Sequence, residues 1–287
     1  MGPRPEYPRP ALRRAEWQNL NGEWEFGAGA TPTFDRSIVV PFCSESELSG
    51  IAELPGDVVW YRRPFEAPAA EVVVLHFGAV DYRATVWVND VEVARHEGGH
   101  TPFSADITGA LRGRDNTLVV RAEDPLADRT IPRGKQYWKE VPEGIFYTPT
   151  TGIWQTVWLE SLPASHIRGL RTSPNLESGA VEIEVDADGR VEVVVTLEGQ
   201  VVGRWSGHDG RGRIQLEHTV PWLPGAPVLY DLQATLFGRD GAAIDRVEGY
   251  FGLRTVETRD GKFYLNGKPF IQRLVLDQGY FPGGLLT

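Results

Sequence analysis

The 287-residue chain has 41% hydrophobic and 24% charged side chains, the composition of a folded globular protein with room for two domains. Its net charge of -10 argues against a general nucleic-acid binder, because non-specific affinity for phosphate backbones comes from clustered Lys and Arg. Its single cysteine, Cys43, excludes an intrachain disulfide and an all-cysteine metal site, which favours a cytoplasmic location.

The amino-terminal segment, residues 1–10, is rich in proline and lacks the apolar core of a secretory signal. No apolar run approaches the roughly 20 residues that a membrane-spanning helix needs. We therefore expect a soluble protein without membrane association.

Short strands are predicted along most of the chain. They are rich in Val, Trp and Leu and are separated by Gly, Pro, Asn and Asp. The clearest are Glu71 to Phe77, Ala84 to Val88, Thr117 to Ala122, Gln155 to Glu160 and Arg190 to Leu197. The 32 glycines and 21 prolines interrupt the chain too often for long helices, so the pattern predicts an all-β protein.

Successive residues of the segment 85–89 switch faces in an extended strand, which predicts that Thr85 and Trp87 share one face. Asn89 and Asp90 follow it and are typical of a hairpin corner.

A polar, proline-bearing stretch at 162–168 predicts the first domain boundary. We expect one β-sandwich over residues 1–165 and a second over 166–257, the latter close to the roughly 100 residues of an immunoglobulin-like sandwich. In the remainder, 258–287, an apolar stretch from Phe270 to Leu276 predicts one further buried strand.

Ordered motifs cover nearly the whole chain. They are LNGEWEF at 20–26, VVWYRRPF at 58–65, VWVND at 86–90, HEGGHTPF at 96–103, GIWQTVWL at 152–159, FGLR at 251–254 and FYLNGKP at 263–269. In this order they resemble the motifs of family 2 glycoside hydrolases, which include β-galactosidases, β-glucuronidases and β-mannosidases. Asp90 and Gln155 stand where the family commonly has glycine and arginine, and 272–274 departs from its usual arginine-glycine.

The resemblance implies a jelly-roll-type β-sandwich, then an immunoglobulin-like β-sandwich, then only the first strand of a (β/α)₈ catalytic barrel at 258–287. It also implies a retaining glycosidase that uses two carboxyl groups about 5 Å apart. In the family both glutamates lie in the barrel, which needs about 250 residues. We therefore expect no catalytic residue in this chain and no activity of the chain alone.

Five residues are candidates for contacting a sugar. Asp124 and Asp128 lie in a loop after a strand, and in related enzymes loops of this sandwich reach the mouth of the active site. Asp277, Gln278 and Tyr280 follow the predicted first barrel strand, at the end where barrel active sites form. Alternatively, the two loop aspartates have no role toward a sugar and lie on the solvated surface or in contacts between domains.

Trp138, Tyr147 and Trp154 have rings that suit the apolar face of a sugar, although we expect Trp154 to pack in the core. The sequence His96 to His100 satisfies the H-E-x-x-H zinc signature, but its two glycines disfavour a helix, and a turn is the better interpretation. Phosphate-loop and dinucleotide motifs are absent, and the six histidines show no ligand spacing, so no cofactor and no metal are predicted.

Two functions remain open. The first is the non-catalytic front of a glycosidase whose barrel is supplied in cis or by a separate chain. The second is a stand-alone carbohydrate-binding or interaction protein. An apolar strand without neighbours exposes backbone groups, so we expect the tail to be disordered, folded back on the second sandwich, or paired between molecules.

Overall fold

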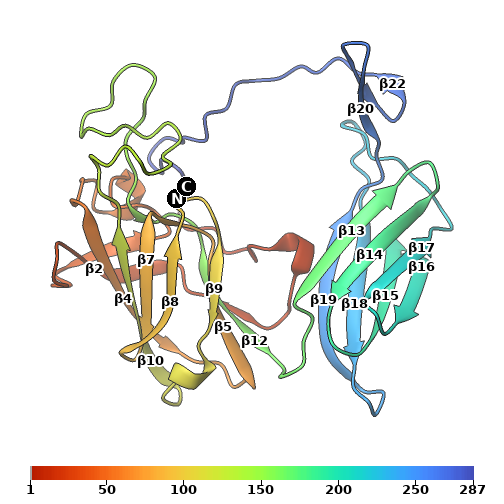
Figure 1. The fold of residues 1–287 in the computed structure, drawn as a ribbon, viewed down its shortest axis with the longest axis horizontal. Coiled ribbons are helices and arrows are strands. Elements are labelled where there is room, and N and C mark those ends of the chain that lie inside the picture. The colour runs from red at the N-terminus through yellow and green to blue at the C-terminus, as the bar shows by residue number, and fades with distance from the viewer. Residues whose placement is uncertain (1) are drawn as a thin grey trace. The chain divides into compact units, whose positions relative to one another are not determined.

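The computed structural model describes residues 2–287. Its contacts divide the chain into two compact units (Figure 1). Unit 1 comprises residues up to Pro8, Glu16–Ser161 and Asp277–Thr287, and unit 2 comprises Arg9–Ala15 and Leu162–Leu276. Each unit therefore includes a segment that is distant in sequence, whereas the predicted limits at 165 and 257 are simple cuts, and these limits stay a prediction.

Unit 1 is a β-sandwich of a four-stranded and a six-stranded sheet, with orders β1-β12-β5-β9 and β3-β2-β4-β10-β7-β8, plus the pair β11-β6. Its strands are β1 (Trp17–Asn19), β2 (Gly22–Ala28), β3 (Arg36–Val40), β4 (Val58–Glu66), β5 (Val72–Phe77), β6 (Val80–Asp81), β7 (Arg83–Val88), β8 (Val91–Glu97), β9 (Phe103–Asp106), β10 (Asp115–Glu123), β11 (Gly152–Ile153) and β12 (Val157–Leu162). Two short 3₁₀ helices, η2 (Glu47–Ser49) and η3 (Thr108–Ala110), lie between them.

The core of unit 1 forms because alternate residues of each strand point inward. Val86 and Val88 are fully buried, while Thr85 and Trp87 lie half-buried on the outer face, as the alternation predicts. Asn89 and Asp90 both have positive φ, 48° and 69°, which is the geometry of a type I′ hairpin turn. Trp24 is the largest fully buried side chain, and its indole N–H donates to Leu20 O at 2.8 Å.

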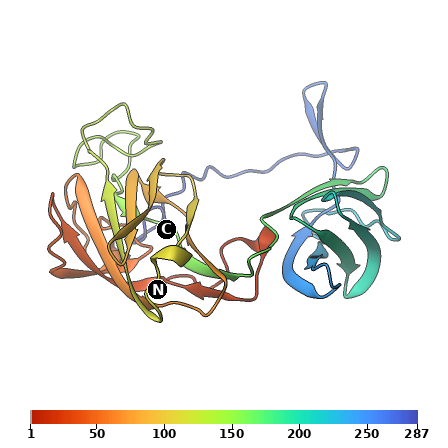
Figure 2. The same ribbon diagram turned by 60° about the horizontal axis from the view of Figure 1, so that its bottom comes forward.

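Unit 2 is a second sandwich, with a three-stranded sheet in the order β13-β14-β17 and a four-stranded sheet in the order β16-β15-β18-β19. Its strands are β13 (Gly169–Asn175), β14 (Ala180–Asp186), β15 (Arg190–Leu197), β16 (Gln200–Gly207), β17 (Arg211–Gln215), β18 (Tyr230–Phe237) and β19 (Ala243–Phe251), and the 3₁₀ helix η1 (Pro10–Leu12) packs beside β19. A small sheet, β20 (Val256–Arg259), β21 (Lys262–Leu265) and β22 (Lys268–Pro269), follows. Figure 2 shows the two sandwich sheets facing each other.

Seven strands in two sheets are the count of an immunoglobulin-like sandwich. Tyr230 is fully buried, its hydroxyl donates to His218 O at 2.9 Å, and it accepts from Val220 N at 2.7 Å. A buried ion pair between Arg14 and Asp245 ties the segment 9–15 to β19. The predicted all-β architecture is thus confirmed.

The tail differs from the prediction. Residues 270–276 form no strand, and Ile271, Val275 and Leu276 are 86%, 91% and 86% exposed. The tail is also not folded back on the second sandwich, because Asp277–Thr287 packs within unit 1. A lone apolar segment has no neighbouring strand to satisfy its backbone, so apolar composition by itself does not make it a strand.

Among the described residues, no helix is long and apolar enough to cross a bilayer.

Candidate functional site

A long loop, residues 124–151, lies at one end of unit 1 between β10 and β11 (Figure 1). Asp124 and Arg133 form an ion pair of 3.1 Å inside it, with 2% and 7% of their side chains exposed. The Arg133 guanidinium also donates to the backbone oxygens of Pro125 and Asp128. One buried cation therefore closes the first ten residues of the loop on themselves.

Asp81 anchors the second half of this loop to the sandwich. Its Oδ2 accepts from Gln136 Nε2 at 2.7 Å, and Gln136 Oε1 accepts from Thr150 N at 2.7 Å. Asp81 itself is 2% exposed. Gly99 passes so close that a Cβ there would lie 2.0 Å from Asp81 Oδ1, so only glycine fits beside this carboxylate.

Two further buried groups hold the end of the loop. Glu45 Oε2 accepts from Thr151 N at 3.1 Å, and the Tyr61 hydroxyl accepts from Ile153 N at 3.3 Å. The backbone of residues 150–153 is thereby bound by side chains from Glu45, Tyr61 and Gln136. These three come from separate parts of the chain, so the loop end is set by tertiary contacts.

The tail segment 277–287 docks against the same end of unit 1. The rings of Tyr280 and Tyr147 stack with their centroids 4.2 Å apart at 15°. Leu48 N donates to Gly283 O at 3.0 Å, and Thr287 Oγ1 donates to Trp154 O at 2.6 Å. Tail and loop therefore meet through both stacking and hydrogen bonds.

The buried and half-buried polar side chains that hold the loop and the tail form one cluster: Ser44, Glu45, Asp81, Asp124, Arg133, Gln136, Thr150 and Tyr280. Three carboxyl groups of this cluster have pKa values raised toward neutral pH. Burial is the largest cause in each case, and it raises the pKa of Asp81 to about 6 and that of Asp124 and Glu45 to about 7. The Asp81 charge adds to the effect at Asp124, while Arg133 opposes it at both aspartates. Burial also raises the pKa of Tyr280 to about 12.

The cluster is polar and incompletely paired. Among the described residues, five of its buried side-chain atoms lack a well-aligned hydrogen bond, although Thr150 lies close to Asp81 and Ser44 close to Glu45: Ser44 Oγ, Glu45 Oε1, Asp124 Oδ1, Arg133 Nη1 and Thr150 Oγ1. The Asp124–Arg133 contact is close enough for an ion pair but poorly aligned for a hydrogen bond at Oδ1. Buried polar groups are nearly always satisfied, so water or a polar ligand is the expected partner of these atoms.

The five site residues predicted from the sequence lie in different environments. Asp124 and Tyr280 belong to the cluster, although Asp124 is committed to Arg133. Asp128 Oδ1 accepts from the backbone and the hydroxyl of Thr130, which closes a turn. Asp277 is exposed and accepts from Gly279 N at 2.7 Å, and Gln278 is half-exposed. Their roles toward a sugar stay predictions.

Aromatic side chains stabilise the outer part of the loop. Trp138 contacts Tyr137, Phe146 and the Arg129 guanidinium, so it holds the loop together. Trp154 is half-buried rather than in the core, and its indole N–H donates to Gly99 O at 2.7 Å. The expected core position is occupied instead by its neighbour Ile153, which is fully buried.

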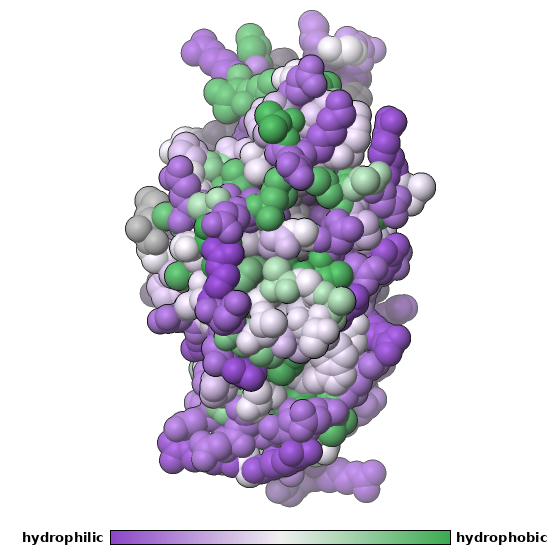
Figure 3. Space-filling view, turned by 90° about the vertical axis from the view of Figure 1, so that its left-hand side faces the viewer, coloured by the Kyte–Doolittle hydropathy of each residue, from purple (hydrophilic) through white to green (hydrophobic). Residues whose placement is uncertain are grey.

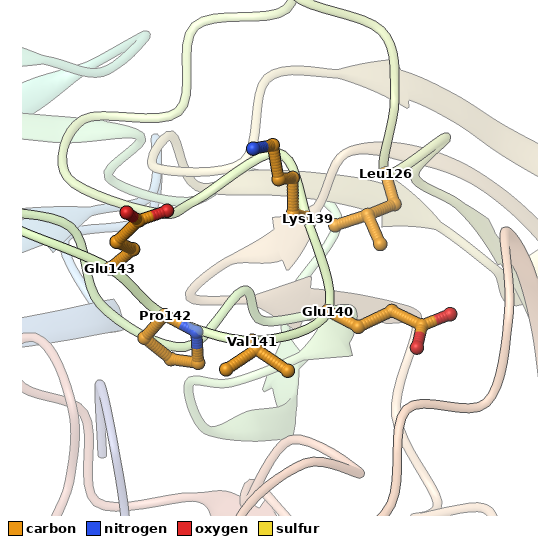
Figure 4. Close-up of a pocket in the computed structure, with 6 residues that line it drawn as sticks. All are labelled: Leu126, Lys139, Glu140, Val141, Pro142 and Glu143. Atoms are coloured by element: carbon orange, nitrogen blue, oxygen red, sulfur yellow. The ribbon is translucent and has the colours of Figure 1, made fainter.

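A shallow pocket of about 550 Å³ lies on the outer loop, lined by Leu126, Lys139, Glu140, Val141, Pro142 and Glu143 (Figure 4). Figure 4 shows the carboxylates of Glu140 and Glu143 pointing apart, so they do not form a catalytic pair. Val141 and Ile145 are 76% and 69% exposed. Figure 3 shows hydrophobic groups near the upper end of the view and others scattered below it among hydrophilic side chains.

The His96–His100 motif forms the end of β8 and a turn, as expected. His96 stacks on Phe103 at 4.4 Å, whereas His100 meets the edge of Trp154 at 5.3 Å. Across residues 2–287, no group of three or more His, Cys, Asp or Glu side chains is arranged to hold a metal ion.

Sequence reasoning missed Glu45, Asp81, Arg133 and Gln136. A weak signal exists for Asp81, because a charged residue directly after the buried Val80 is unusual in a strand. The loop residues Arg133 and Gln136 lie among many polar residues, and nothing local separates them from solvated ones.

Comparison with known proteins identifies both units. Residues 36–153 match the glycosyl hydrolase 2 galactose-binding domain-like model, and residues 165–254 match the glycosyl hydrolases family 2 model. The chain is 29% identical over 92% of its length to the β-glucuronidase of Felis catus, and 30% identical over 78% to the β-galactosidase of Thermoanaerobacter pseudethanolicus. It covers 48% of the first and 32% of the second, so it spans about half or less of these relatives.

Solved structures agree on the fold. A β-glucuronidase from Ruminococcus gnavus in complex with D-glucuronic acid superposes with a TM-score of 0.74 at 22% identity, over 90% of this chain and 50% of that one. The β-D-glucuronidase of Dictyoglomus thermophilum gives a TM-score of 0.73 at 21% identity, over 90% of this chain and 47% of that one.

The matched part of these relatives is their amino-terminal, non-catalytic half. The chain therefore belongs to glycoside hydrolase family 2, whose galactose-binding-like and immunoglobulin-like β-domains it contains.

Proposed function

We propose that this chain is the β-region of a retaining β-glycosidase, in which it orients a catalytic barrel and forms part of the wall of its sugar site. A β-glucuronide is the first substrate to consider, because the β-glucuronidases of Felis catus, Canis lupus familiaris and Sus scrofa are all 28–29% identical to it. The β-galactosidase among the relatives makes a β-galactoside the second.

The observation that carries the proposal is the stacking of Tyr280 on Tyr147. By the family resemblance, Tyr280 follows the first barrel strand, at the end where barrel active sites form. Tyr147 belongs to the loop 124–151, which Asp81 and Arg133 hold rigidly. This stacking supports a position of the loop beside the expected mouth of the barrel, where it can limit the space open to the substrate.

Hydrolysis would require two carboxyl groups about 5 Å apart around the glycosidic bond. The acids of the cluster do not serve this purpose, because Asp124 is paired with Arg133 and Asp81 with Gln136. We therefore propose that the two catalytic glutamates belong to the barrel, supplied in cis or by another chain. We also propose a cytoplasmic location, which the buried free thiol of Cys43 supports.

The test compares two proteins. Purified chain 1–287 should hydrolyse none of the nitrophenyl β-glucuronide, β-galactoside, β-glucoside and β-mannoside. DNA downstream of codon 287 should encode a barrel with two glutamates, and the extended protein should cleave at least one of these substrates. In that protein Tyr280→Ala should raise KM more than it lowers kcat. Turnover by the 1–287 chain itself, after removal of contaminating enzymes, would contradict the proposal.

A second candidate function is a stand-alone carbohydrate-binding protein. The docking of Asp277–Thr287 on unit 1 favours it, because a segment that packs on its own sandwich does not need a barrel to be ordered. The same experiment distinguishes the two candidate functions. A stand-alone binder has no downstream barrel and binds a sugar without hydrolysing it.

A further inference from the structure

Unit 2 carries a groove of about 710 Å³ on the outer face of the sheet β16-β15-β18-β19. Alternation along the strands explains which residues line it. Val193, Val195 and Leu232 point into the core and are at most 2% exposed, so their neighbours point outward into the groove. The segment 9–15, tied to β19 by hydrogen bonds between Arg13 and Glu248, adds one wall.

The groove lies over β18 and β19, with lining residues of β15 and β16 beside them. The outward residues of β18 run from Asp231 to Phe237, a span of about 20 Å at the rise of an antiparallel strand. Tyr250 lies at one end, opposite Asp231, and is 45% exposed. Phe237 lies at the other end, where the Arg190 guanidinium covers its ring at 3.9 Å. Tyr250 is therefore the ring that remains open to a ligand.

Several polar side chains in the groove have unused hydrogen-bonding capacity. Within residues 2–287, the side chains of Thr196, Gln233, Arg246 and Tyr250 make no hydrogen bond and no ion pair. An amide and hydroxyls beside an exposed ring suit a ligand that offers hydroxyl groups around an apolar C–H face.

The charges of the groove balance. Three arginines, Arg13, Arg204 and Arg246, face three acids, Glu192, Asp231 and Glu248, in a chain whose net charge is -10. Arg204 and Glu192 already pair at 3.3 Å. A neutral polar ligand complements such a surface, whereas a polyanion or a polycation meets as much repulsion as attraction.

We propose that this groove binds a neutral, extended oligosaccharide. Tyr250 stacks on one sugar ring, while Gln233 and Thr196 hydrogen-bond hydroxyl groups along the chain. An extended ligand is expected because the lining residues reach along β18 from Asp231 to Phe237. The proposal does not rest on the function proposed for unit 1, since every lining residue belongs to unit 2.

The test uses the intact 1–287 chain and isothermal titration with cellopentaose, xylopentaose and mannopentaose. We expect at least one to bind with a Kd on the order of 0.1–1 mM, because a shallow site recovers little beyond the cost of association. Tyr250→Ala should weaken that binding about tenfold or more, and Gln233→Ala about fivefold, the loss expected for one neutral hydrogen bond. Tyr250→Phe should retain most of the affinity.

Matched controls lie outside the groove in the same unit. Phe270→Ala removes a ring of similar exposure, 37%, and Gln200→Ala removes an exposed amide, and both should bind like the parent. Thermal unfolding of each variant shows whether unit 2 is intact. Absence of binding to all three sugars, or binding that Tyr250→Ala leaves unchanged, overturns the proposal. So does a change in sedimentation on Tyr250→Ala without any sugar, because the face would then be an interface between copies of the chain.

Discussion

Asp124 and Arg133 form a buried ion pair of 3.1 Å that also organises the backbone around it, since the same guanidinium binds two loop carbonyls. The pair joins the end of β10 to the middle of the loop 124–151. A separate hydrogen bond, from Gln136 to Asp81, holds the second half of that loop. Rigidity of the loop thus depends on a few buried polar groups.

Replacement of Arg133 by Ala should destabilise unit 1 by about 1–3 kcal/mol, because Asp124 loses its cation and stays protonated while the carbonyls of Pro125 and Asp128 lose their buried donor. Urea unfolding followed by hydrogen exchange of peptides from β4 and β10 measures the loss. Arg114→Ala is the matched control, since its ion pair with Glu66 is exposed and should contribute little to stability. Equal effects of the two substitutions would contradict a special role for the buried pair.

The stability of unit 1 should fall as pH rises from about 5 to 8. Burial raises the pKa of Asp81, Asp124 and Glu45 above the value near 4 expected in the unfolded chain, so the folded state holds more protons in this interval. The stability contributed by these groups is fully present below about pH 4 and is lost as pH passes through about 6 and 7.

The measurement is the free energy of unfolding of unit 1 at pH 5, 6, 7 and 8. Asp124→Asn should flatten the profile, because an amide stays neutral throughout. Peptides from β15 in unit 2 report the internal control. A profile of unit 1 that is flat, or that rises toward pH 8, would show that these carboxyls remain ionised in the fold.

Gly99→Ala should destabilise unit 1 and displace Asp81 from Gln136. The added Cβ would lie 2.0 Å from Asp81 Oδ1, so the carboxylate must move, at a cost of about 1–3 kcal/mol. Gly109→Ala is the control, since no atom lies within 4 Å of a Cβ there. Thermal unfolding compares the two, and faster exchange of the Thr150 amide would report the lost anchor. A neutral Gly99→Ala would show that the close approach is not maintained in solution.

The tail should show two regimes of hydrogen exchange. Amides of residues 270–276 should exchange at nearly the unprotected rate, because this segment has no strand partner and is mostly exposed. The amides of Phe281 and Leu285 should be protected, since each donates to the backbone oxygen of the other residue. Tyr280→Ala should reduce that protection by removing the stack on Tyr147. Uniformly fast exchange across 277–287 would show that the tail does not dock.

The strands and turns of both sandwiches were predictable because their signals are local. Arg190 to Leu197 was expected as a strand and is one, and Asn89 and Asp90 form the expected turn. Phe270 to Leu276 was wrongly expected as a strand, because an apolar segment pairs only where a neighbouring strand is available. Of the site, Asp124 and Tyr280 were named from their places after strands, although their roles toward a sugar stay predictions.

By itself, the sequence determined an all-β chain of two sandwiches and its family, since alternation, turn residues and ordered motifs are properties of neighbouring residues. Only the tertiary structure decided which polar groups meet at the end of unit 1. Asp81 and Gln136 are 55 positions apart, and Glu45 and Thr151 are 106 apart. Contacts over such separations depend on how the sheets pack, and no local pattern of residues specifies them.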